Sequence, residues 1–174
     1  MNDASKVALH ADLVPISWLI GSWVGVGVGG YPTVEEFRFG QEVSFSTDGR
    51  PFLSYASRAF LLDENGEKVR PLGVETGFLR PRPNNEVEMV LAHPTGYAEV
   101  WAGQVTVTGI VDAAITGARI DMHTDVVART ASAKEYTAGH RLYGFVEGDL
   151  LWTFDMAAVG HSLQSHLSAR LKRV

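Results

Sequence analysis

The sequence predicts an all-β fold, either an antiparallel barrel or a sandwich. From residue 34 onward, apolar residues alternate with polar or small residues in successive runs of strand length, as in half-buried strands. Turn-forming stretches such as DENGEK and RPRPNN separate these runs at intervals of roughly 8–12 residues. Connections this short join antiparallel neighbours, because parallel strands require longer crossovers, usually helical.

Composition narrows the class of protein. The 174 residues, 45% of them hydrophobic and 20% charged, predict a single domain over 1–174 with its own core, and residues 1–11 are expected to be flexible. The chain has no cysteine, which excludes thiol catalysis and disulfides. The net charge of −5 without a basic stripe argues against nucleic acid as a partner. No apolar run approaches the ~20 residues of a membrane span, and the N-terminus lacks a secretory pattern, so we expect a cytoplasmic protein with no membrane partner.

The first elements are a helix and a glycine-rich strand. Residues 11–21 carry apolar side chains at helical spacing, with Pro15 expected in the first turn and Gly21 at the end. In the stretch GSWVGVGVGGYP that follows, Trp23 and three alternate glycines share one face of a strand, opposite a face of valines. Such a bare face indicates either a sharp barrel bend or the close approach of a flat group. The residues alone favour a bend, with Trp23 plugging one end of a barrel.

The remaining chain predicts further strands up to the C-terminus. Their predicted ranges are 34–46, 52–62, 72–81, 85–93, 96–103, 104–111, 118–128, 134–146 and 149–156. The final segment, residues 160–174, fits both a helix and a strand. A strand is favoured, because a closed barrel removes its exposed edges by pairing its last strand with its first.

Four blocks of the sequence resemble the nitrobindins, a family of haem-binding β-barrels. These blocks are GSWVGVGVGGYPT, FRFGQEVSFSTDGRPFLSYASR, AKEYTAGHRLY and MAAVGHSLQSHLSARLKR, and together the resemblance covers roughly residues 12–174 in the same order. It implies a ten-stranded antiparallel β-barrel with a short N-terminal helix. It also implies one b-type haem per subunit, held at a wide barrel mouth by a single histidine.

The resemblance also implies a set of site residues. His166, in the SHL block, matches the proximal ligand of the haem iron and is the catalytic candidate. Ser44 matches a hydroxyl residue that faces the haem, and Lys134 matches a lysine near the haem edge that pairs with a propionate, although an exposed lysine is the alternative. The residues of the glycine-rich signature complete the cofactor-binding set: Gly21, Trp23, Gly25 and Gly27. Their bare strand face is expected to pack on the macrocycle or on the chain that crosses the barrel mouth.

Members of the family are described as stable in the ferric state, as binding nitric oxide and as converting peroxynitrite to nitrate. The resemblance therefore implies a haem-dependent peroxynitrite isomerase, with peroxynitrite and nitric oxide as its small-molecule ligands and a homodimer as one open oligomeric state. A non-enzymatic carrier of a fatty acid or other apolar ligand is the main alternative. It would place Arg38, Arg58 or Arg141 inside the barrel and turn His166 to solvent. A nitric oxide sensor is a third alternative that shares the haem site.

The other histidines are weaker candidates. His161 lies five residues before His166, and we interpret it as a solvated loop residue. Asp121, His123 and Asp125 share one face of a predicted strand, where they either hold a divalent metal or form the polar outer face of a barrel. The remaining ones are interpreted as loop or surface residues: His10, His93 and His140.

Overall fold

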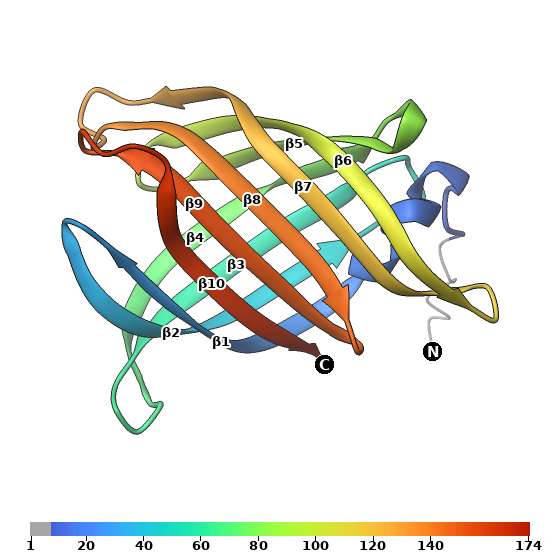
Figure 1. The fold of residues 1–174 in the computed structure, drawn as a ribbon, viewed down its shortest axis with the longest axis horizontal. Helices are drawn as coiled ribbons and strands as arrows, with labels where there is room; N and C mark the ends of the chain where they lie inside the picture. Colours follow the sequence, from blue (N-terminus) through green and yellow to red (C-terminus); the bar gives the residue numbers. More distant parts are fainter. Residues whose placement is uncertain (1–7) are drawn as a thin grey trace, which may run out of the picture.

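A computed structural model describes residues 8–174 and shows a closed barrel of ten antiparallel strands (Figure 1). Each strand pairs with its sequence neighbours, and β1 also pairs with β10 to close the barrel. The predicted ten-stranded barrel is therefore confirmed and the sandwich is excluded. Residues 1–7, which carry most of the expected flexible segment, lie outside the described residues.

The strands follow the predicted runs closely. They are β1 Gly21–Tyr31, β2 Val34–Ser46, β3 Leu53–Leu62, β4 Lys68–Pro81, β5 Glu86–His93, β6 Tyr97–Val111, β7 Ala114–Arg129, β8 Tyr136–Val146, β9 Asp149–Ala158 and β10 Gln164–Arg173, with a short 3-10 turn, η2, at Pro83–Asn85. The predicted break between residues 103 and 104 is wrong, because β6 runs through it. Gly103 serves there as a point of close approach, since a Cβ at this position would collide with the Asp121 carbonyl and lie 2.7 Å from the Met122 Cα on β7.

The predicted N-terminal helix is a 3-10 helix, η1, over Ala11–Leu19. It closes one end of the barrel (right in Figure 1), where the side chains of Leu13, Ile16 and Leu19 are fully buried. Pro15 lies at the fifth position rather than in the first turn, which corrects the prediction. The helix tolerates a missing N–H there because its stability comes from the docked apolar side chains rather than from its own hydrogen bonds.

Strand β1 shows the predicted two faces. Trp23 and the alternate glycines face the barrel interior, while the valines between them are exposed. Trp23 is fully buried and its Nε1 donates to the Leu19 carbonyl at 2.8 Å. Its ring also packs edge-on against Phe145. Trp23 therefore joins the first strand to η1 and plugs this closed end, as the residues alone indicated.

The first and last strands of the barrel meet at the seam between β1 and β10. The pairing runs from Trp23 opposite Arg173 to Gly29 opposite Leu167, so the last segment is a strand and the helical alternative is wrong. Arg173 donates to the carbonyls of Ile20 and Trp18, which ties the last strand to η1. Within residues 8–174, no helix is long and apolar enough to cross a membrane.

Candidate functional site

The end of the barrel opposite η1 is open. Five connections surround it: residues 32–33, 63–67, 94–96, 130–135 and 159–163 (left and lower left in Figure 1). Here β1 and β10 separate beyond Gly29 and Leu167. The register of β10 against β9 shifts between Ser165 and Leu167, so His166 is the extra residue of a β-bulge. A bulge re-aims its side chain, and this one lies beside the opening.

His166 is anchored across the seam to the first strand. Its Nδ1 lies 3.0 Å from the Gly30 carbonyl oxygen, at a second register shift, between Gly29 and Tyr31 on β1. A carbonyl only accepts hydrogen bonds, so Nδ1 must carry the proton and donate it. Nε2 is then left as the free lone pair, with no hydrogen-bond partner among residues 8–174. This tautomer is the one a metal ion requires, and the carbonyl also fixes the ring orientation.

Aromatic rings surround the His166 imidazole. Tyr31 packs edge-on at 5.6 Å between ring centroids and Phe154 at 5.9 Å. Tyr31 is itself fixed by its hydroxyl, which accepts from the Ala158 N–H at 3.0 Å. Burial lowers the pKa of His166, against the opposing effect of the hydrogen bond to Gly30. The imidazole is therefore held neutral, and a single neutral nitrogen in apolar surroundings fits the proximal position of a haem iron.

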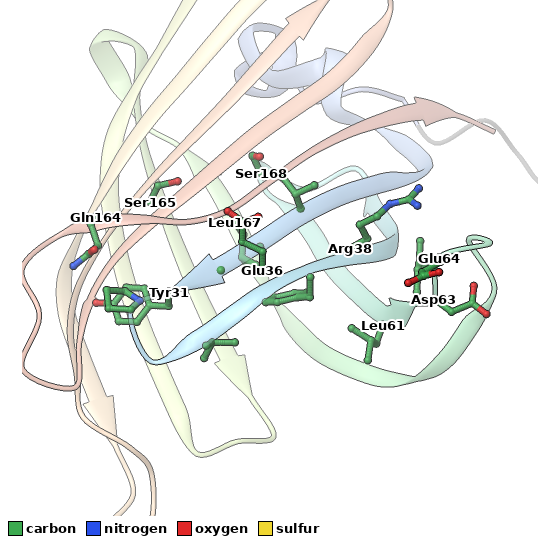
Figure 2. A pocket seen from close by; sticks show the side chains of 17 residues that line it. Tyr31, Glu36, Arg38, Leu61, Asp63, Glu64, Gln164, Ser165, Leu167 and Ser168 are labelled. Carbon is green, nitrogen blue, oxygen red and sulfur yellow. The ribbon is translucent and has the colours of Figure 1, made fainter.

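A groove of 1030 Å³ flanks this segment of β10 (Figure 2). It lies between the β1–β2 hairpin, the end of β3 and the β10 residues on either side of His166. Its lining is apolar at Phe37, Leu61 and Leu167, and polar or charged side chains lie along the rest. The size is at the upper end of the ~300–1,000 Å³ range of small-molecule sites. Tyr31 lines this groove, but His166 and Phe154 do not, so the groove flanks the imidazole rather than enclosing it.

Three of the predicted cofactor residues lie at the closed end instead. Trp23 precedes Gly30 by seven residues of extended strand, roughly 23 Å, and Gly21 lies further still. Ser44 lies between the buried Val43 and Phe45, so it points to the outside of β2. The structure does not bring Gly21, Trp23 or Ser44 together with His166, because strand length and the two-residue period place them elsewhere. A haem contact for Ser44 is not supported.

The interior glycines of β1 allow close packing within the barrel itself. A Cβ on Gly25 would collide with the backbone carbonyl of Arg170 on β10. A Cβ on Gly27 would collide with the Phe39 ring and the Ser168 carbonyl. The bare face is thus filled by the last strand and by a phenylalanine of β2, which supports the barrel-bend interpretation of these glycines over packing on a macrocycle.

Lys134 lies at the open end, as His166 does, but in the loop before β8 rather than on a strand. Its side chain is exposed, and its carbonyl accepts a hydrogen bond from the Tyr97 hydroxyl at 2.8 Å. From Tyr97 a chain of edge-on aromatic contacts leads through Tyr136 and Phe154 to His166. The proposed pairing of Lys134 with a haem propionate therefore stays a prediction.

Two other histidines also lie at this end. His161 is exposed in the loop before β10, as expected, and packs edge-on against Tyr31 at 5.8 Å. His93 was interpreted as a loop or surface residue, and this is wrong. It ends β5 with its side chain only 15% exposed and its Nε2 2.9 Å from Glu99. Burial lowers the pKa of His93, but Glu99 and Glu75 outweigh that effect and raise it overall. In the sequence, apolar residues alternate along β5 up to Leu91, and this alternation places the His93 side chain on the same inward face.

The barrel interior contains a buried ion pair that bears on the carrier alternative. Arg141 is 1% exposed, and its two terminal nitrogens donate to the Glu75 carboxylate at 2.9 and 2.8 Å. The guanidinium faces inward, as a fatty-acid carrier requires, but Glu75 already occupies its carboxylate-binding fork. Arg38 and Arg58 are exposed. With His166 half-buried rather than turned to solvent, the interior does not favour the carrier.

A closed ten-stranded barrel with a carbonyl-anchored histidine at its open end fits the class of haem-binding β-barrel proteins. The family described as THAP4-like, heme-binding beta-barrel domain matches residues 12–173, and the chain belongs to this family. Both the nitrobindin resemblance and haem as the cofactor are thereby confirmed.

Known relatives cover nearly the whole chain. A protein of Nocardioides sp. named peroxynitrite isomerase is 52% identical over 165 residues, covering 95% of this chain and 94% of the relative. A ferric nitrobindin-like protein of Kineococcus radiotolerans is 51% identical over 177 residues and covers 93% of each chain. The crystal structure of Rv2717c from M. tuberculosis superposes with a TM-score of 0.87 at 36% identity, covering 96% of this chain and 99% of that one.

Proposed function

We propose that this chain is a ferric haem-b protein that isomerises peroxynitrite to nitrate, with one haem per subunit ligated by His166. The observation that carries the proposal is the 3.0 Å hydrogen bond from His166 Nδ1 to the Gly30 carbonyl. This bond leaves the lone pair of Nε2 free to bind the haem iron. Two relatives named peroxynitrite isomerase, 52% and 50% identical to this chain over 94% and 82% of their own lengths, support the same reaction. Nitric oxide is the second proposed ligand. The cytoplasm is the proposed location, and a homodimer is the proposed oligomeric state.

The residues around His166 contribute ligation and exclusion of water. The bound iron would supply one open coordination position, where a small anion or diatomic gas binds. Gly30 holds the tautomer, and the Tyr31 and Phe154 rings shield the imidazole and fix its plane. Gly30 and Phe154 carry no ionisable side chain. Isomerisation of peroxynitrite to nitrate suits such surroundings, because it conserves atoms and charge and needs no proton shuttle.

A haem titration of the purified apoprotein tests the proposal. We expect a saturable one-to-one Soret band in the wild type, which is lost or shifted in His166→Ala. His161→Ala is the matched control, since His161 lies at the same end of the barrel and also contacts Tyr31. An identical band in His166→Ala would refute the ligand assignment. If the haem-loaded wild type converted peroxynitrite no faster than free haem does, the enzymatic function would be refuted as well.

A further inference from the structure

A second cluster of metal-binding side chains lies on the outside of the barrel. The side chains of Asp121 and His123 on β7 and of His140 on β8 place their ligand atoms within 4.8 Å of one another. His140 is paired directly with His123 across the strands, and the two rings stack at 4.3 Å between centroids. The inward neighbours Met122 and Arg141 are buried, so the cluster projects outward, on the opposite face of these strands from the barrel interior.

The cluster differs from the group that the sequence suggested. Asp121 and His123 belong to it, but Asp125, two residues further along β7, does not. His140 is predicted to be a loop or surface residue; it does lie on the outer surface, but within β8 rather than in a loop, and its side chain is only 23% exposed. Only the register between β7 and β8 brings it opposite His123. The sequence pattern of either strand alone therefore could not show that His140 faces His123.

The spacing is close to that of a transition-metal site. Bonds of ≈2.0–2.1 Å in a tetrahedral site place ligand atoms about 3.3 Å apart. Asp121 Oδ1 lies 2.9 Å from His140 Nε2 and 3.6 Å from His123 Nε2. His123 is 65% exposed, so its imidazole has room to swing toward the other two ligands. Two imidazoles and a carboxylate favour zinc and its neighbours in the first transition row over calcium or magnesium.

A fourth residue orients the central histidine. Asp155, on β9, lies with Oδ2 3.3 Å from His140 Nδ1, and β8 and β9 pair these two residues directly. A carboxylate on Nδ1 orients the ring so that Nε2 faces Asp121 Oδ1, and a bound metal would replace this contact in the carboxylate–histidine–metal arrangement of known sites. The same device operates at His166, where a backbone carbonyl takes the place of the carboxylate.

We propose that Asp121, His123 and His140 form a binding site for a divalent transition metal of the zinc class, with Asp155 as the residue that positions His140. The three ligands leave one coordination position for water or for a donor from another molecule. The three ligands lie on β7 and β8, so a bound ion joins these two strands on the face opposite the interior, and Asp155 links β9 to the site through its contact with His140.

Calorimetric titration with Zn²⁺ tests the site. The full, haem-loaded chain is used, because haem then occupies His166 and keeps it from binding zinc. We expect one Zn²⁺ per chain in the wild type and at least a tenfold weaker affinity in His123→Ala and in His140→Ala. Asp155→Asn keeps all three ligands and is expected to weaken zinc binding about 10–100-fold, as loss of such an orienting partner does. His10→Ala is the control, because His10 also lies beside an aspartate, Asp12, at 3.7 Å but away from the cluster.

Each outcome decides the proposal. Absence of zinc binding, or unchanged affinity in His140→Ala, would overturn the site, and so would a loss of binding in His10→Ala. Unchanged affinity in Asp155→Asn would overturn the positioning role alone. Zinc should also raise the thermal unfolding midpoint of the wild type and leave that of His123→Ala unchanged. This variant alters a largely exposed side chain, so it keeps the test decisive if His140→Ala fails to fold.

Discussion

Replacement of Glu75 by Gln tests the energetic role of the ion pair inside the barrel. The Glu75 carboxylate, 20% exposed, accepts both terminal nitrogens of the fully buried Arg141 and the Tyr55 hydroxyl at 2.8 Å. Burial raises the pKa of Glu75, but Arg141 outweighs this and lowers it to about 2 from an ordinary 4.5. Glu75→Gln keeps the shape of the side chain and removes its charge, leaving the guanidinium buried without a counterion.

The expected cost can be worked out in two ways. A pKa that is lower by roughly 2.5 units in the folded state corresponds to about 3 kcal/mol of stability. Removal of one partner of a buried pair typically costs about 3–5 kcal/mol. Because the folded pKa is depressed, this stability is fully present above pH 4.5 and is lost as the pH falls toward 2. We therefore expect Glu75→Gln to lower the free energy of unfolding by about 3 kcal/mol at pH 7 and by less than about 1 kcal/mol at pH 2.

Urea unfolding of both proteins at a series of pH values measures this difference, and the comparison cancels the other titrating groups. Glu42→Gln is the matched control, because Glu42 pairs with Arg58 and Lys68 on the outer face and should contribute within about 1 kcal/mol. The reasoning is refuted if Glu75→Gln is as stable as the wild type at pH 7. It is equally refuted if the difference does not shrink on acidification.

Two further variants test the packing at the seam and at the open end. Gly27→Val forces a side chain into the Phe39 ring and the Ser168 carbonyl, so we expect a loss of about 3 kcal/mol in urea unfolding, with unchanged haem affinity in the folded protein. A valine variant that folds stably but loses haem would instead favour contact with the macrocycle. Tyr31→Phe leaves the buried Ala158 N–H without its acceptor and should cost about 1–3 kcal/mol, whereas equal stability would show that water replaces the hydroxyl.

Most of the fold was predictable because alternation is a local property of a strand. The run of residues 34–46 became β2 with the same bounds, since more and less buried positions alternate from Phe37 to Ser46. Closure by β10 followed from the need to remove exposed edges. The break predicted inside β6 failed, because a glycine that admits a neighbouring backbone resembles a glycine that makes a turn.

The site was predictable only in part. The resemblance led to His166, but nothing near it in the sequence indicates its partner, the Gly30 carbonyl, 136 residues away. The Arg141–Glu75 pair, 66 residues apart, and the facing of His123 by His140 likewise depend on strand register. Register is set by the whole barrel, and a sequence pattern that identifies strands does not align them.

The seam between β1 and β10 sets the order of events as the protein matures. His166 belongs to β10, and the carbonyl that orients it belongs to β1, so the ligand is not pre-organised until these two strands of the barrel have paired. The contact joins residues 136 apart in the sequence, so its loop-closure cost is high compared with that of the hairpins of the barrel. Haem capture at His166 accordingly depends on β1 and β10 being both formed and paired.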